Sequence, residues 1–195
     1  GDITVKGSGH NAFFDFDTFT VDRFERNSGL EVAKGNTLGL VGKNILLQGG
    51  NITAPEGNIE LVSIAKAGTV ELISNDLGWN FAYSELDTGN IDLTNSASID
   101  ISGDGSGNIQ IQANGVNLTD GSSIFAETEG NTPGGLTQIT ANEVNIVGTD
   151  PDINLPSSIW SGVLFDATED GGDVLIETGS LLLEGGGQIN VNTFG

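Results

Sequence analysis

The chain has 195 residues and carries 27 acidic side chains against 6 lysines and arginines, a formal net charge of −21. Nucleic-acid binding needs a basic surface, so this charge excludes that class of partner, and it disfavours docking on anionic lipid. The absence of Cys excludes disulfides and thiolate metal sites, and a single histidine, His10, is too few for histidine-rich metal sites. Because no Met is present and the chain opens in the middle of a pattern, we expect a segment of a longer protein or a processed product.

Residues 1–36 predict an irregular N-terminal segment. The stretch "GDITVKG" has the alternation of a strand. An aromatic-rich stretch follows and predicts a longer excursion, which ends where the chain rejoins a regular pattern at Leu30–Val32. Both arginines of the chain, Arg23 and Arg26, belong to this excursion.

From residue 37 onward, two short alternating strands recur with a polar turn between them, and self-similarity of this kind indicates a repeat architecture. Four residues separate the strands in Leu38/Leu40–Ile45/Leu47, Ile109/Ile111–Val116/Leu118, Thr137/Ile139–Val144/Ile146 and Val174/Ile176–Leu181/Leu183. The turn is longer in Ile91/Leu93–Ile99/Ile101 and in Ile59/Leu61–Val70/Leu72. We therefore place repeat starts at residues 38, 59, 91, 109, 137 and 174. A third strand follows in three places, around Ile52, Ile124 and Ile189.

These strands predict an all-β chain that winds as a parallel β-helix over residues 37–195. Alternation with a period of two places every second side chain on one face, so Ile, Leu and Val would stack inside from coil to coil. The turn asparagines Asn90, Asn108, Asn114 and Asn117 would stack as amide ladders. A β-sandwich is the alternative, but sandwich strands would not share one repeated spacing.

The repeat starts are unevenly spaced, and the surplus residues predict loops that leave the β-helix. We place the main loops at about 74–89, 127–135 and 148–172. The first and the third contain the two tryptophans of the chain, Trp79 and Trp160.

Three stretches of the chain resemble the filamentous-haemagglutinin type of two-partner-secretion exoprotein, in the variant common among cyanobacteria. They read "LGLVGKNILLQGGNITAPEGNIELVSI", "GNIDLTNSASIDISGDGSGNIQIQANGVNLTDGSSIFAET" and "GGDVLIETGSLLLEGGGQINVNTFG". The opening "VKGSGHNAFFDFDTFTV" is similar to the stretch just downstream of the secretion domain in that family. The Asn-Pro signatures of the secretion domain itself are absent, so we expect the segment to follow that domain.

The resemblance implies a right-handed parallel β-helix (solenoid) that is exported through an outer-membrane two-partner-secretion transporter. The full-length protein would then be secreted or displayed on the cell surface. Members of the family are commonly adhesins.

Aromatic side chains in the predicted loops are the candidate ligand-binding residues, because exposed rings stack on sugars or fill a partner's pocket. The first set is Trp79, Phe81 and Tyr83, and the second is Trp160 and Phe165. The alternative is that both loops fold back and that these rings cover the side of the β-helix.

The acidic loop "DATEDGGD" is the weak candidate for a calcium site, through Asp166, Glu169, Asp170 and Asp173. A solvated acidic loop is the alternative. We expect no other cofactor.

We expect a non-catalytic adhesin-type shaft or module that mediates attachment to surfaces, cells or glycans. The structural alternative is a subunit of an extracellular filament or matrix that associates end to end through open strand edges. A polysaccharide lyase or hydrolase is the distant alternative, because a lyase site needs a base and several carboxylates on one face. Both arginines instead lie in one N-terminal excursion.

Overall fold

The computed structural model describes residues 6–7, 12–16, 19–22, 29–66, 69–75, 78–83 and 87–193. These residues form an all-β structure that contains no helix, and none of them belongs to a helix that could cross a membrane. His10, Arg23 and Arg26 lie outside the described residues, as does most of the strand expected in "GDITVKG".

The largest sheet has nine strands, and all its pairings are parallel. It contains β2 (Ala12–Phe16), β3 (Phe19–Asp22), β5 (Thr37–Gly42), β6 (Ile45–Gln48), β8 (Asn58–Ser63), β11 (Asn90–Thr94), β13 (Asn108–Thr119), β15 (Leu136–Val147) and β17 (Asp173–Glu184). The strand β13 is long enough to pair with β8 along its first half and with β11 along its second half.

A second sheet has seven strands, also parallel throughout. It contains β1 (Lys6–Gly7), β4 (Gly29–Val32), β7 (Asn51–Thr53), β12 (Ser98–Asp100), β14 (Ser123–Phe125), β16 (Ser158–Val163) and β18 (Gln188–Thr193). The remaining strands, β9 (Val70–Asn75) and β10 (Gly78–Tyr83), form an antiparallel hairpin.

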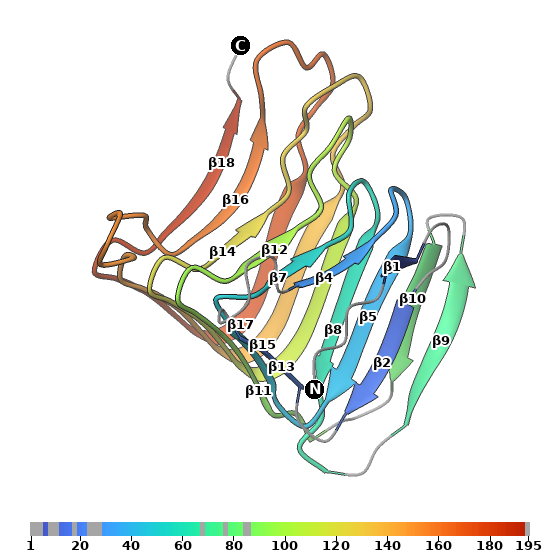
Figure 1. The fold of residues 1–195 in the computed structure, drawn as a ribbon, viewed down its shortest axis with the longest axis vertical. Coiled ribbons are helices and arrows are strands. Elements are labelled where there is room, and N and C mark those ends of the chain that lie inside the picture. The colour runs from blue at the N-terminus through green and yellow to red at the C-terminus, as the bar shows by residue number, and fades with distance from the viewer. Residues whose placement is uncertain are drawn as a thin grey trace.

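The chain alternates between the two large sheets in a fixed order (Figure 1). One passage crosses the nine-stranded sheet, either as two short strands or as one long strand, and then adds one strand to the seven-stranded sheet. We call such a passage a round. Successive rounds, such as β13–β14, β15–β16 and β17–β18, pair in parallel with the round before them.

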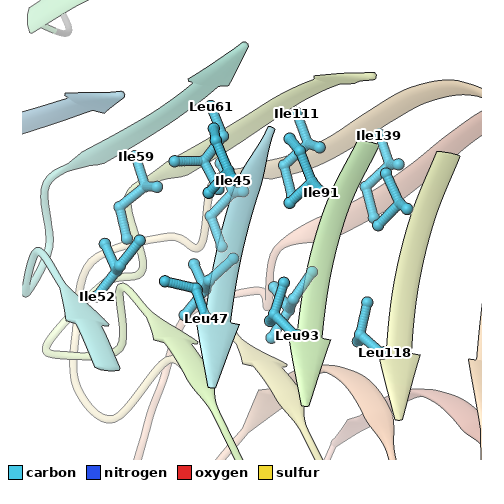
Figure 2. Close-up of a cluster of buried hydrophobic side chains, with 14 of the residues drawn as sticks. Ile45, Leu47, Ile52, Ile59, Leu61, Ile91, Leu93, Ile111, Leu118 and Ile139 are labelled. Atoms are coloured by element: carbon cyan, nitrogen blue, oxygen red, sulfur yellow. The ribbon is translucent and has the colours of Figure 1, made fainter. Parts of the chain in front are cut away.

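Every second side chain of the paired strands points into one shared apolar core, as the alternation predicts. Leu47, Leu93 and Leu118 hold equivalent positions in β6, β11 and β13, and all three are fully buried. Figure 2 shows two such rows, Leu47–Leu93–Leu118 and Leu61–Ile111–Ile139. Since burial of one such side chain stabilises by roughly 1.5–3 kcal/mol, the stacked rows are the main source of cohesion.

Asparagine side chains hydrogen-bond from round to round, and this confirms the predicted amide ladders. The linked pairs are Asn58–Asn108, Asn90–Asn114, Asn114–Asn142 and Asn117–Asn145. The amide of Asn142 donates to Oδ1 of Asn114 at 2.9 Å. These bonds add to the alignment of the rounds that the buried apolar face already specifies.

A column of glycines lies at the corner where the rounds of β8, β13, β15 and β17 enter the nine-stranded sheet. It consists of Gly57, Gly107, Gly135 and Gly172. A Cβ on Gly107 would overlap the carbonyl oxygen of Gly57, and a Cβ on Gly135 would overlap that of Gly107. The backbones of successive rounds therefore approach too closely at this corner for any side chain.

The predicted repeat starts at residues 59 and 91 belong to a single round, so a separate start at residue 91 is wrong. The strand β8 pairs with the first half of β13, and β11 pairs with the second half. The strand that was expected to follow β8, β9, pairs with β10 instead. Both strands of a hairpin alternate with a period of two, so β9 matched the repeat pattern without stacking in it.

The N-terminal segment, expected to be irregular, follows the order of the later rounds where it is described. Its strands β2, β3 and β4 pair in parallel with β5, β6 and β7. The aromatic-rich stretch of the sequence therefore includes strands of the two large sheets.

Two of the three predicted loops contain strands. The segment 74–89 includes β10, and the segment 148–172 includes β16, which pairs with β14 and β18. The turn before β16 contains Pro151 and Pro156, residues typical of loops, so the strand was not expected although Ile159, Ser161 and Val163 in it are buried. The segment 127–135 contains no strand, as predicted.

The last round differs from the inner ones in exposure. Leu118 is 0% exposed, whereas Leu183, two rounds later in an equivalent position, is 46% exposed. No described strand pairs with the outer edges of β17 and β18, so the inward side chains of this round are left partly uncovered.

Candidate functional site

The hairpin β9–β10 is the one insertion with strands of its own among the described residues, and it leaves and rejoins the sheet at a single point between β8 and β11. The amide of Gly89 donates to the carbonyl of Ser63 at 3.2 Å, and Ala65 N–H donates to the carbonyl of Asp87 at 2.6 Å. Lys66 and Asp87 add an ion pair at 2.7 Å. The two ends of the insertion are thus held together where the hairpin joins the sheet.

The hairpin lies over the outer face of the nine-stranded sheet (Figure 1, β10 and β9). Trp79 N–H donates to Thr37 Oγ1 at 3.3 Å, and Phe81 N–H donates to Glu60 Oε2 at 3.4 Å. Glu60 and Val62 alternate with the core-facing residues of β8 and so point outward, yet both are buried. Their burial is due to the hairpin rather than to the core.

The three predicted aromatic residues of this segment lie in β10 and not in a loop. Phe81 is 6% exposed, and Trp79 and Tyr83 are half-buried. The hydroxyl of Tyr83 donates to Gln112 Oε1 at 3.1 Å and accepts from Gln110 Nε2 at 3.3 Å. Phe81 therefore helps to cover the sheet, as the alternative reading expected, and Tyr83 joins the hairpin to β13. Ligand binding by the three rings stays a prediction.

A cavity of about 140 Å³ lies beside β10 on the same outer face. Its lining comes from β8, β10, β13 and β15: Asn58, Glu60, Asn80, Asn108, Ile109, Gln110, Leu136 and Gln138. The walls carry five amide side chains and one carboxyl group, and no Lys, Arg or His. This combination can donate and accept hydrogen bonds but carries no positive charge.

Hydrogen bonds hold the floor of the cavity in place. Asn108 donates to Asn58 Oδ1 through both its backbone and its side-chain nitrogen, at 3.2 and 3.1 Å. Leu136 N–H donates to Asn108 Oδ1 at 2.9 Å. Gln138 Nε2 donates to Glu177 Oε2 at 3.1 Å. The amide positions are therefore fixed by strands and not by a mobile loop.

Glu60 is the buried ionisable group of the site and is 1% exposed. Burial raises the pKa of Glu60 to about 7, and the hydrogen bond from Phe81 N–H opposes this rise only in part. The pKa of Tyr83 is also raised, first by burial and in addition by the nearby Glu60 charge, while the bond from Gln110 lowers it. Near neutral pH the cavity thus holds a carboxyl group poised between its two protonation states.

The second aromatic set lies on the other sheet. Trp160 is a half-buried residue of β16, beside Phe125 of β14, and Phe165 is 69% exposed in the turn after β16. The structure therefore does not bring Trp160 and Phe165 together with the β10 aromatics. Their role in binding stays a prediction.

The four candidate calcium ligands, Asp166, Glu169, Asp170 and Asp173, are all exposed. Within the described part of the chain, no three acidic or His side chains come close enough together to hold a metal ion. Calcium binding by this acidic segment stays a prediction.

Comparison of the chain with protein-family models, with curated proteins and with solved structures finds no match.

Sequence reasoning missed the cavity residues Glu60, Gln110 and Gln138. All three hold equivalent register positions in β8, β13 and β15, between two core-facing residues of each strand, and they pair side by side in the sheet. An alignment of the repeats would have placed them in one row. The hairpin that covers one end of this row gives no comparable signal in the sequence.

Proposed function

We propose that the chain is a segment of a right-handed parallel β-helix and that it acts as a non-catalytic attachment module on a secreted or cell-surface protein. The fixed order of the rounds, their parallel pairing and the single aliphatic core support the β-helical reading. The resemblance to filamentous-haemagglutinin-type exoproteins supports the handedness, the location and export through an outer-membrane partner.

One observation carries the binding function: a hairpin is inserted into an otherwise regular scaffold and borders a partly open polar cavity on the outer face of the nine-stranded sheet. The scaffold needs no such insertion, because the other described rounds pair without one. Binding residues commonly lie on segments that a rigid scaffold positions in this way.

The hairpin can be removed at its base to test this function. Replacement of residues 66–86 by a Gly-Ser turn joins Ala65 to Asp87, which already lie next to each other because they are hydrogen-bonded. Beads coated with the intact chain are expected to attach to films of cellulose or mannan, and beads with the shortened chain to attach several-fold less. Shortening residues 129–133 to the same turn is the matched control and should leave attachment unchanged. Equal attachment of all three coatings, or of none, contradicts the proposal.

A structural role is the second candidate, and the last round favours it. Leu181, Leu183 and Val191 are 46%, 46% and 59% exposed beside the outer edges of β17 and β18, with which no described strand pairs, and such edges are templates for further strands. A filament subunit of this kind would form long filaments from chains of about this size. Electron microscopy of native material, with the mass of its intact chain, separates this role from single rods built of a much longer chain.

A further inference from the structure

We propose that the cavity between β10 and the outer face of the nine-stranded sheet binds one uncharged hexose unit of a polysaccharide, through Glu60, Gln110 and Gln138. This inference rests on the proposed attachment function and names its ligand.

The size of the cavity favours a single sugar unit. Pockets that enclose drug-sized ligands measure about 300–1,000 Å³, and the cavity here is about 140 Å³. It would therefore hold one ring, or one edge of a ring, of a longer chain. Next to it, the outward side chains of Gln112, Thr140 and Glu177 continue across β13, β15 and β17 in register. A polysaccharide could extend along that row.

The chemistry of the walls selects against anionic ligands and metal ions. The lining has no Lys, Arg or His, and the whole chain carries a net charge of −21, so an anionic sugar would be repelled. A metal ion is disfavoured because Glu60 is the one carboxylate in the lining. An apolar ligand would displace water from the free amide oxygens of Gln110 and Gln138 without replacing its hydrogen bonds, which is unfavourable.

Sugar hydroxyls are suitable partners for the amide and carboxyl groups that line the cavity. Each hydroxyl both donates and accepts a hydrogen bond, as a primary amide does. Gln110 and Gln138 each use one N–H group, toward Tyr83 and toward Glu177, and their carbonyl oxygens have no partner among the described residues. Glu60 accepts one hydrogen bond there, at 3.4 Å from Phe81 N–H. The two partly buried amide oxygens are therefore available to accept hydrogen bonds from sugar hydroxyls.

The test is an NMR titration of the intact chain that follows the side-chain NH₂ signals of Gln110 and Gln138. The probes are the hexamers of α- and β-linked glucose, mannose and galactose, with hexagalacturonate as an anionic probe. At least one neutral hexamer is expected to shift both signals, and the anionic probe to shift neither. Gln138→Ala should weaken that affinity at least tenfold, whereas Gln188→Ala, a matched change on the seven-stranded sheet, should leave it unchanged.

The outcomes separate this inference from the attachment function. No shift with any neutral hexamer, or an unchanged affinity in Gln138→Ala, overturns the cavity as the sugar site. If the hairpin deletion still abolishes bead attachment in that case, the attachment function stands and its contact lies elsewhere on the hairpin. If Trp160→Ala, and not Gln138→Ala, removes binding, the site belongs to the seven-stranded sheet and the proposal is wrong.

Discussion

The two faces of β8 are both buried, but by different means. Its inward residues, Ile59 and Leu61, are covered by the core that every round extends. Its outward residues, Glu60 and Val62, are covered by one hairpin that occurs once in the described chain. The inward face belongs to the core that all rounds share, whereas the outward face is covered by an insertion found in one round only.

The two faces also differ in chemistry. The inner rows are aliphatic and tolerate few polar atoms, while the outer row holds a carboxyl group and amides beneath the hairpin. Changes to the inner face or to the spacing between rounds should affect stability at every pH. Changes to the outer face should affect pH dependence or binding.

The largest expected effect on stability comes from a substitution that disturbs the close spacing between rounds. Gly107→Ala places a methyl group against the carbonyl oxygen of Gly57, where only backbone displacement can relieve the overlap. We expect a loss of more than about 4 kcal/mol in the free energy of unfolding, or failure to fold. Urea denaturation and the yield of soluble protein measure it.

Gly179→Ala is the matched control for this change. Its new Cβ would lie 3.1 Å from the carbonyl oxygen of Asn142, a contact that a small adjustment relieves. We expect a loss of less than about 1 kcal/mol there. Similar losses in the two variants would show that close stacking at the corner is not the cause.

The next largest effect concerns the outward face of β8, where Glu60 should make the free energy of unfolding depend on pH. The folded pKa of Glu60 is about 7 against an ordinary value of 4.5, so folding favours its protonated form. The stabilising contribution is therefore complete below pH 4.5 and is lost as the pH rises toward 7. At about 1.4 kcal/mol per pH unit, the loss is about 3 kcal/mol. Glu60→Gln cannot titrate at this position, so this contribution to the pH dependence should be absent from the variant.

Urea denaturation of wild type and Glu60→Gln at pH 4.5 and pH 8 measures this difference. The stability of the variant relative to wild type should rise by about 3 kcal/mol between the two pH values. Glu143→Gln, a change at an exposed position of β15, should show no such rise. Parallel pH profiles for wild type and Glu60→Gln would falsify the assignment of a buried, hairpin-covered carboxyl group.

A smaller effect on stability is expected at Thr137, a polar residue on the inward face of the sheet. Thr137 holds a core position between Ile109 and Val174 and is 1% exposed, and its hydroxyl has no hydrogen-bond partner in the part of the chain that the structure describes. Thr137→Val removes this buried hydroxyl at nearly constant shape, so we expect a gain of about 1–2 kcal/mol in unfolding free energy. Thermal denaturation should show a higher midpoint. In Thr140→Val, the control, the lost hydroxyl donates to Glu177 at 3.3 Å, and no gain is expected.

The contrast between the faces also explains what could be predicted from the sequence. The positions of Leu38, Ile109, Thr137 and Val174 predicted where rounds begin and that they pair in parallel. This was possible because the same pattern of core-facing residues recurs in these rounds. The asparagine ladders followed for the same reason. In contrast, Val70 and Leu72 alternate like core residues but pair within a hairpin. Alternation reveals that a residue lies in a strand, but it does not reveal which strand lies beside it.

The site was harder to predict because no signal in the sequence marks the hairpin that covers it. The rings of β10 were identified as candidates, but their position against the sheet depends on contacts such as Phe81 N–H to Glu60. Gln110 and Gln138 looked like ordinary outward residues of solvated strands. Their importance comes from the hairpin above Glu60, far away in the sequence.

The smallest expected effect concerns the turns that align the rounds. Asn114 donates to Asn90 at 3.4 Å and accepts from Asn142 at 2.9 Å, so Asn114→Ala breaks two links of one ladder. Because a hydrogen bond at an exposed position contributes about 0.5–1.5 kcal/mol, we expect a loss of about 1 kcal/mol. Asn142→Ala removes one of these two links and should cost about half as much. Denaturation of both variants measures the ratio, and equal or absent losses would mean that the apolar rows alone hold the rounds in register.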